Sequence, residues 1–318
     1  MAVKIGRPSV AFALLPGDRT RVEPPSPPID PQDDDAIDRL LERGIQADRT
    51  SCPDLRGQLT HLQTGSVDRV IVNLIPVFPV HASPLSMAWC GENVALMAAG
   101  LKFLRKLCGV AKCIIATDGP AAALLAGPVR RAGRVRMLRR SYPQGDPHVL
   151  IYTLTRRKLP VGALPTERGV LLLDAAAVIA IADAAEGRPM THVPVRVDDY
   201  LVRVRTGTPL GEIVDKPMIA GDLPRNVIVD ADHRVGSGEL VFQTPLAAAD
   251  PPDKCIRCGW CLDACPTHIH PVGLGEAAQR GDRELASTFG LEHCIDCGNC
   301  AAVCPSRLPL LEAIRSLR

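Results

Sequence analysis

Cysteines with the spacing of metal ligands crowd one short stretch of this sequence. Of the 12 cysteines in 318 residues, eight lie between positions 255 and 304. They form two runs, each of the pattern C-x2-C-x2-C-x3-C followed by proline: Cys255, Cys258, Cys261 and Cys265, then Cys294, Cys297, Cys300 and Cys304. A disulfide scaffold would spread its cysteines through a small secreted chain, so this grouping indicates metal binding in a reducing compartment.

The duplicated run favours two [4Fe–4S] clusters. Two-cluster ferredoxins carry the same run, and in them the fourth cysteine of each run ligates the other cluster. Two residues between cysteines let the chain curl so that three thiolates reach three corners of one cube. We therefore predict Cys255, Cys258, Cys261 and Cys304 as the ligands of cluster 1, and Cys294, Cys297, Cys300 and Cys265 as those of cluster 2.

Zinc and radical chemistry are the alternatives that the spacing disfavours. Four ligands close a structural zinc site, so zinc does not need three tightly spaced cysteines plus a fourth, twice over. A radical-generating cluster leaves one iron without a cysteine ligand, whereas each predicted cluster has four. The stretch is interpreted as an electron-transfer module, and each fourth cysteine is expected to begin a helix that points toward the other cluster.

Composition excludes some classes of partner. The formal net charge is +2 and aromatic residues make up 3%, which argues against a nucleic-acid-binding surface. The longest apolar stretch, 169–185, is interrupted by Asp174 and Asp183 and is too short to cross a bilayer. The apolar run 9–15 lacks a signal-peptide cleavage site. We expect a cytoplasmic protein, and peripheral attachment to the inner membrane or residence in a microcompartment stays open.

The sequence before the cysteines has the pattern of an α/β domain. An N-terminal segment with a proline-rich linker, 1–35, precedes a region 36–190 in which strands alternate with helices, which indicates a mainly parallel sheet. The predicted strands are 67–74, 113–117, 135–138 and 149–154, and the predicted helices are 36–43, 92–107, 121–126 and 175–185.

Short strands replace the helices between residues 191 and 246. The candidates are 192–197, 200–205, 226–229 and 240–242, with one short helix at 208–214 that Thr208 would cap and Pro209 would open. This pattern predicts a small β-grasp-like domain. In the remaining domain, 247–318, the helical pattern at 273–291 is typical of an α-helical ferredoxin.

The chain resembles the RnfC component of the Rnf electron-transport complex and the RnfC-like cobalamin reductases of bacterial microcompartments. The resemblance covers the chain from about residue 37 onward. Three segments carry it: the whole of 255–318, the motif Ser141-Tyr142-Pro143-Gln144-Gly145 with Leu154-Thr155 and Leu159-Pro160 after it, and Val204-Arg205-Thr206-Gly207-Thr208-Pro209.

The resemblance implies a fold and a set of cofactors. It implies an α/β domain like the flavin domain of the NADH-binding subunit of respiratory complex I, then a soluble-ligand-binding β-grasp domain, then the clusters. Electrons would pass between a nicotinamide cofactor, FMN and the clusters, with redox proteins of a membrane complex or a microcompartment as partners. The positions that the resemblance assigns to FMN or nucleotide are Asn73, Tyr142, Gln144 and Gly145.

Two loops depart from the family pattern. The family has a Gly-Gly-Ala-Gly-Phe-Pro loop before the first strand, where residues 48–57 hold one glycine. It has Asn-x-x-Glu-Cys-Glu-Pro after the strand, where residues 73–79 keep Asn73 and lose both acidic residues. The lost glycines remove the close backbone approach that a phosphate cradle requires. A degenerate flavin site and a working one are therefore both kept as hypotheses.

Three functions follow from these observations. The first is a flavin-linked subunit that takes electrons from NADH, which the retained 142–145 motif favours. The second is a flavin-free iron–sulfur relay on a vestigial flavin-domain scaffold, which the changed loops favour. The third is an assembly subunit whose clusters stabilise the fold. Of the other cysteines, Cys108 and Cys113 are predicted to be core residues, Cys90 is either a packed or a reactive thiol, and Cys52 has no assigned role.

Overall fold

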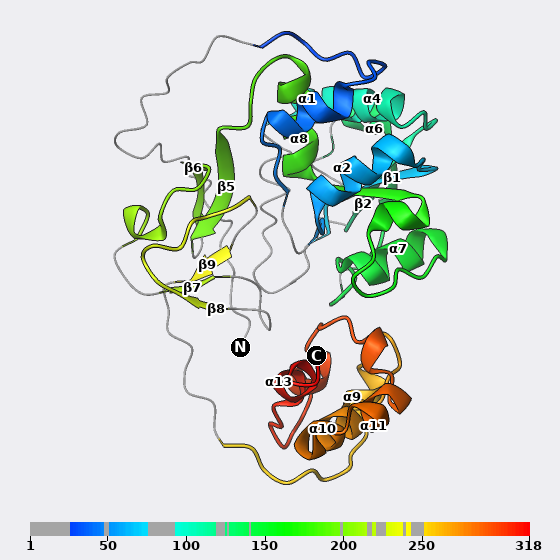
Figure 1. Ribbon diagram of the computed structural model, residues 1–318, viewed down its shortest axis with the longest axis vertical. Coiled ribbons are helices and arrows are strands. Elements are labelled where there is room, and N and C mark those ends of the chain that lie inside the picture. Colours follow the sequence, from blue (N-terminus) through cyan, green and yellow to red (C-terminus); the bar gives the residue numbers. More distant parts are fainter. Residues whose placement is uncertain are drawn as a thin grey trace. The chain divides into compact units, whose positions relative to one another are not determined.

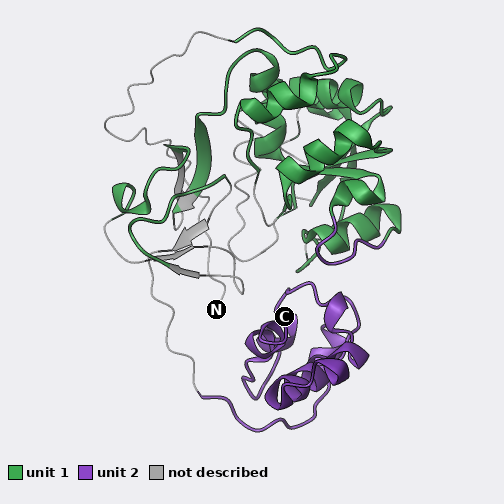
Figure 2. Cartoon of the chain, viewed as in Figure 1, with its two compact units in different colours: residues 1–157, 164–245 green, residues 158–163, 246–318 purple. Residues whose placement is uncertain are grey.

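The chain forms two compact units, which are described separately. Figure 1 shows a computed structural model that describes residues 26–47, 51–75, 93–118, 125, 127–139, 141–197, 200–214, 218–220, 227–237, 240–242 and 251–318. The first unit comprises residues 1–157 and 164–245, and the second comprises 158–163 and 246–318 (Figure 2). The predictions for segment 1–25, for the loop 76–79, for Cys90 and for most of the helix at 121–126 lie outside the described residues.

A parallel four-stranded sheet forms the centre of the first unit (Figure 1). Its strands are β1 (Arg69–Asn73), β2 (Cys113–Thr117), β3 (Gly133–Met137) and β4 (Val170–Asp174). The order is β3-β2-β1-β4, and every pair is parallel. The predicted parallel α/β sheet is therefore confirmed. The all-buried β4, Val-Leu-Leu-Leu-Asp, reads as a continuous apolar run because strands of such sheets are covered on both faces.

Six helices of the first unit are described: α1 (Ala36–Glu42), α2 (Leu55–Thr64), α4 (Val94–Leu107), α6 (Gly127–Ala132), α7 (Pro147–Thr155) and α8 (Ala175–Ala185). The helices predicted at 36–43, 92–107 and 175–185 are confirmed as α1, α4 and α8. Helices α4 and α8 pack closely at Gly100, where an added Cβ would lie 2.2 Å from the Val178 carbonyl oxygen. A residue without a side chain is therefore required there.

The strand predicted at 149–154 is wrong, because this segment forms helix α7. Asp146 caps the helix by accepting a hydrogen bond from the His148 amide at 2.9 Å, and Pro147 occupies its first turn. Both are helix-start signals. A short apolar run does not by itself distinguish a buried strand from a buried helix, and the capping residues decide it here.

A second, mixed sheet completes the first unit. It contains β5 (His192–Val197), β6 (Tyr200–Arg205), β7 (Met218–Ala220), β8 (Val227–Val229) and β9 (Leu240–Phe242) in the order β6-β5-β9-β7-β8. Strands β5 and β9 are parallel and the other pairs antiparallel. The helix predicted at 208–214 is a shorter 3-10 turn, η2 (Leu210–Glu212), and the predicted cap is wrong: Pro209 precedes it, while the Thr208 hydroxyl donates to the Arg205 carbonyl at 2.7 Å.

The second unit is helical and internally repeated. It contains α9 (Trp260–Asp263), α10 (Pro271–Arg280), α11 (Arg283–Thr288), η3 (Leu291–His293), α12 (Asn299–Ala302) and α13 (Leu310–Arg315). Cys294 follows Cys255 by 39 residues, and α12 and α13 begin 39 residues after α9 and α10. The predicted helical pattern at 273–291 is confirmed. The prediction that each fourth cysteine begins a helix is wrong, since Cys265 follows α9 and Cys304 follows α12.

Within the described ranges, no helix has both the length and the apolar character to cross a bilayer.

Cys52 and Gln58 protect the open edge of the parallel sheet. Strand β4 lies at that edge, and its Leu172 amide donates to Gln58 Oε1 at 2.9 Å. The Leu172 carbonyl accepts a hydrogen bond from the Cys52 thiol at 2.9 Å, and Gln58 Nε2 donates to the Pro53 carbonyl at 2.7 Å. Exposed strand edges leave backbone groups unpaired. These two buried side chains satisfy them, which gives Cys52 a structural role.

The substitution Gln58→Ala should lower the free energy of unfolding by about 1–3 kcal/mol, because it leaves buried backbone groups of Leu172 and Pro53 without partners. The matched control is Gln63→Ala on the same helix, an exposed residue bonded to Asp38, whose loss should cost within about 0.5 kcal/mol. Urea unfolding followed by circular dichroism measures both. Equal effects of the two substitutions would contradict the role given to Gln58.

Candidate metal centre

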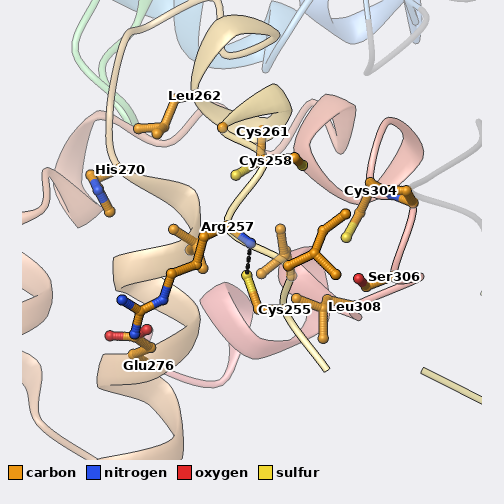
Figure 3. Close-up of a pocket in the computed structure, with 15 residues that line it drawn as sticks. Cys255, Arg257, Cys258, Cys261, Leu262, His270, Glu276, Cys304, Ser306 and Leu308 are labelled. Atoms are coloured by element: carbon orange, nitrogen blue, oxygen red, sulfur yellow. Dashed lines mark hydrogen bonds between the residues drawn. The ribbon is translucent and has the colours of Figure 1, made fainter. Parts of the chain in front are cut away.

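Four cysteines from both runs line one pocket of the second unit. Figure 3 shows Cys255, Cys258, Cys261 and Cys304 around this space, whose volume is about 340 Å³. A single water needs only about 10–15 Å³ of such space. The pocket therefore has room for a group of several atoms, lined by the four sulfur ligands that the sequence predicts for cluster 1.

Left-handed backbone conformations curl the first run around this pocket. Arg257 and Gly259 adopt positive φ angles of 55° and 83°. As a consequence the Arg257 amide turns back and donates to Cys255 Sγ at 3.4 Å, the contact drawn in Figure 3. The short helix α9 then carries Cys261. Two residues between cysteines are thus enough to reverse the chain and gather the three thiols.

Backbone ties bring Cys304 to the same place although it is 49 residues from Cys255. The Ser306 hydroxyl donates to the Lys254 carbonyl at 2.9 Å, and the Asp253 amide donates to the Ser306 carbonyl at 2.9 Å. Arg307 adds an ion pair with Asp253 at 2.7 Å. The segment after the second run is therefore fastened to the segment before the first run.

The other four cysteines form a buried group. Cys265, Cys294, Cys297 and Cys300 expose only 7%, 8%, 9% and 8% of their surface. Burial raises the pKa of the Cys300 thiol to about 12, and the nearby Cys297, Cys294 and Cys265 raise it further. Burial also raises the pKa of Cys294, with Asp296 and Cys265 adding to the effect. Thiols this hard to ionise become thiolates only when a bound cation replaces the lost hydration.

Asn299 and Asp296 connect this group to the rest of the unit. Asn299 Nδ2 donates to the Ala264 carbonyl at 3.1 Å, which ties the second run to the residue before Cys265. The Asp296 carboxylate accepts from Arg315 Nε at 3.2 Å and from an Arg318 guanidinium nitrogen at 3.1 Å. Arg318 also donates to the carbonyls of Cys294 and Leu291. Sequence reasoning missed these positioning residues, since no local pattern relates Arg318 to a loop 22 residues earlier.

The geometry suits clusters better than single ions. Zinc bonded at about 2.3 Å holds all of its sulfur ligands within roughly 4 Å of one another. Among the described residues, no three or more His, Cys, Asp or Glu side chains are placed to hold one metal ion. A cubane instead presents four iron atoms at separate corners, so its thiolates need not converge on one point.

The residues assigned to flavin lie together but serve the fold. Asn73 is buried at the end of β1; its Nδ2 donates to the Gly145 carbonyl at 2.8 Å, and its Oδ1 accepts from the Ile75 amide at 3.0 Å. Gln144 Nε2 donates to the Thr153 hydroxyl on α7 at 3.2 Å, and Tyr142 lies half-buried in the same turn. The structure thus brings Asn73 and Gly145 together, and one donor and one acceptor of Asn73 are used to join strand and turn.

The stretch that replaces the glycine-rich loop does not fit a phosphate. Asp54 caps helix α2 by accepting from the Gly57 amide at 2.9 Å, and a Cβ on Gly57 would lie 2.2 Å from Asp54 Oδ2. A helix N-terminus attracts anions through its free amides and its dipole. Here a carboxylate of the chain already occupies that position, and its charge would repel a phosphate. Residues 51–58 are therefore unsuited to holding flavin phosphate.

The remaining described cysteines are core residues. Burial raises the pKa of both the Cys108 and the Cys113 thiols to about 12. Cys113 is buried on β2 and its thiol donates to the Leu101 carbonyl at 3.6 Å, while the partly buried Cys108 packs against the same apolar core. The prediction for these two residues is confirmed.

Comparison with known proteins agrees with the cysteine geometry. Residues 254–308 match the 4Fe-4S dicluster domain family. The chain is 28% identical over 207 residues to the RnfC-type component of the Na(+)-translocating ferredoxin:NAD(+) oxidoreductase complex of Acetobacterium woodii, covering 57% of this chain and 46% of that protein. It is 30% identical over 250 residues to the corresponding component of the ion-translocating oxidoreductase complex of Rhodobacter capsulatus, covering 70% and 48%.

The fold also has a solved counterpart. A chain of an NAD+-reducing [NiFe]-hydrogenase in its H2-reduced state aligns with a TM-score of 0.55 at 12% identity, covering 91% of this chain and 60% of that one. At this identity the likeness concerns the fold alone.

The matched domain and the grouped cysteines place the chain in the class of dicluster iron–sulfur electron-transfer proteins. More particularly, it is an RnfC-like protein, similar to the RnfC components of ion-translocating oxidoreductase complexes. The chain spans about half the length of the curated relatives it matches.

The substitution Arg318→Ala should loosen the loop between Cys294 and Cys297, because it removes charge-assisted hydrogen bonds to Asp296 and to the Cys294 carbonyl. Such bonds contribute about 1.5–3 kcal/mol, so amide hydrogen exchange at residues 294–298 should accelerate about tenfold or more. Arg280→Ala, at an exposed position of α10, is the control and should leave exchange unchanged. Equal protection in both variants would show that Arg318 does not hold this loop.

Proposed function

We propose that this chain relays electrons through two [4Fe–4S] clusters as the iron–sulfur subunit of an RnfC-like oxidoreductase. The observation that carries the proposal is the pocket lined by Cys255, Cys258, Cys261 and Cys304, which combines three thiols of one run with the last thiol of the other. Four thiolates around a space for several atoms are the donor set of a cubane cluster. When bound, such clusters supply reversible one-electron reduction.

The proposed ligand sets follow the same interleaving. Cluster 1 takes Cys255, Cys258, Cys261 and Cys304, and cluster 2 takes Cys294, Cys297, Cys300 and Cys265. The Coulombic interactions of Cys300 with Cys297, Cys294 and Cys265 support the second set. The ties from Ser306 to Lys254 and from Asn299 to Ala264 support the exchange of the fourth ligands, because each holds one run beside the other.

The donor and acceptor are proposed from the relatives. Proteins named as subunits of ferredoxin:NAD(+) and ion-translocating oxidoreductase complexes are similar to this chain, so we infer redox protein partners, with a membrane complex favoured over a microcompartment as host and a peripheral place in it. The second sheet is proposed to be the soluble-ligand-binding β-grasp domain of the resemblance, which its mixed order with a parallel β5–β9 pair supports.

A flavin-free relay is the form of this function that the first unit favours. The Asp54 carboxylate at the start of α2 and the Asn73 amide used between β1 and the 142–145 turn both argue against flavin binding by these residues. Electrons would then pass between protein partners, and NADH would be oxidised, if at all, by a partner. The FMN-linked alternative keeps its basis in the family resemblance.

Anaerobic purification with cluster reconstitution tests the proposal. About eight irons and eight sulfides per chain are expected, four of each per cubane, with no released flavin. The variants Cys304→Ser and Cys265→Ser should each retain about four irons, because each closes a different cluster. Cys108→Ser changes a thiol outside both groups and should keep about eight.

Three outcomes would count against parts of this proposal. Zinc in place of iron would overturn the cluster assignment. Stoichiometric FMN, together with bleaching of the clusters by NADH, would replace the flavin-free relay by the flavin-linked one. Retention of about eight irons by Cys304→Ser would refute the proposed ligand set of cluster 1.

A further inference from the structure

We propose that the two clusters are inequivalent: cluster 1, in the exposed cysteine set, has the higher reduction potential and exchanges electrons with the partner, while cluster 2, in the buried set, has the lower potential. This inference rests on the proposed function, since it requires both clusters. Burial sets the order of the potentials, and the charges at Arg257 and Asp296 adjust the gap.

The two sites share one backbone frame. Residues 39 positions apart adopt nearly the same left-handed conformations: φ is 55° at Arg257 and 58° at Asp296, and 83° at Gly259 and 74° at Gly298. The same holds after each fourth cysteine, with 56° at His268 and 52° at Arg307. Because the chain curls alike around both clusters, backbone conformation gives them no reason to differ. Any difference must come from burial and side-chain charge.

Burial differs strongly between the two sets. All four cysteines of cluster 2 are buried, whereas Cys255 and Cys258 of cluster 1 are exposed and Cys261 and Cys304 are half-buried. A cluster held by four thiolates is an anion, and reduction adds one more negative charge. Water stabilises that added charge and a low-dielectric interior penalises it. The buried cluster is therefore harder to reduce, in keeping with the known dependence of such potentials on exposure.

The charges at the repeated left-handed position are opposite. Arg257 lines the pocket of cluster 1, with Glu276 on the same pocket (Figure 3). At the corresponding position of cluster 2, Asp296 Oδ1 lies 3.8 Å from Cys294 Sγ. A carboxylate so close to a ligand sulfur opposes the arrival of an electron. Arg315 and Arg318 pair with Asp296, so the role of Asp296 is to hold cluster 2 below the potential that two arginines alone would give it.

This order gives the relay a direction. One electron passes from reduced cluster 2 to oxidised cluster 1; the first is oxidised, the second is reduced, and no proton moves. The electron then resides on the cluster nearer to solvent. Cluster 1 is also flanked in sequence by the exposed side chains of Ile256 and Trp260, at 67% and 56% exposure, so a redox partner can approach it closely.

An anaerobic redox titration of the eight-iron protein, followed by electron paramagnetic resonance, tests the order of potentials. Two one-electron steps are expected, separated by at least a tenfold ratio of reduction equilibrium constants, which is about 59 mV. A soluble paramagnetic relaxing agent should act more strongly on the signal of the step at higher potential, because cluster 1 is the exposed one. A single step, or a stronger effect on the low-potential signal, would overturn the proposal.

Matched substitutions at the repeated position assign the residues. Asp296→Asn should raise the lower step about tenfold or more in equilibrium constant and leave the upper step in place, whereas Arg257→Gln should lower the upper step. Asp296→Glu keeps the charge and should leave both steps near their original values, which separates charge from loop packing. A shift of the upper step by Asp296→Asn would contradict the assignment. Iron content well below eight in the unaltered chain would instead count against the proposed function itself.

Discussion

The second unit is organised around one constraint: eight thiols from two runs must assemble into two groups, each completed by a cysteine of the other run. Neither run can do this alone, so the segments on both sides are tied to each other. Ser306 bonds to Lys254 at the start of the first run, and Asn299 bonds to Ala264 near its end. The packing of α10 against α13 belongs to the same arrangement, because these helices hold corresponding places in the repeat.

Repetition of a backbone does not repeat its electrostatics. The left-handed residues keep the chain path the same in both halves, while one set of cysteines is buried and the other reaches solvent. For an electron carrier this difference is useful, because a gradient of potential requires two sites that bind the same group with different free energies. A duplicated frame with unequal burial and unequal charge is a simple physical way to obtain one.

The first unit keeps a parallel α/β architecture but uses its local chemistry for stability. At the edge of β4, Gln58 and Cys52 satisfy the backbone groups of Leu172. At the start of α2, Asp54 takes the place where a phosphate would meet free amides. The family that this chain resembles is glycine-rich in this stretch, and side chains that complete hydrogen bonds within the protein leave little for a cofactor. The scaffold can persist after the site has changed, because the sheet and its core do not depend on the loop.

The sequence by itself determined the metal chemistry, since the cysteine spacing is local and short-range geometry gathers three thiols from each run. It also determined strands such as 113–117 and helices such as α8, where a continuous apolar segment leaves few alternatives. Tertiary structure decided the rest. Residues 149–154 are helical because Asp146 caps them, Cys52 matters because β4 lies at an edge, and Arg318 positions a loop that only folding brings near. Each of these depends on contacts between segments distant in sequence or on a competition that an apolar pattern leaves open.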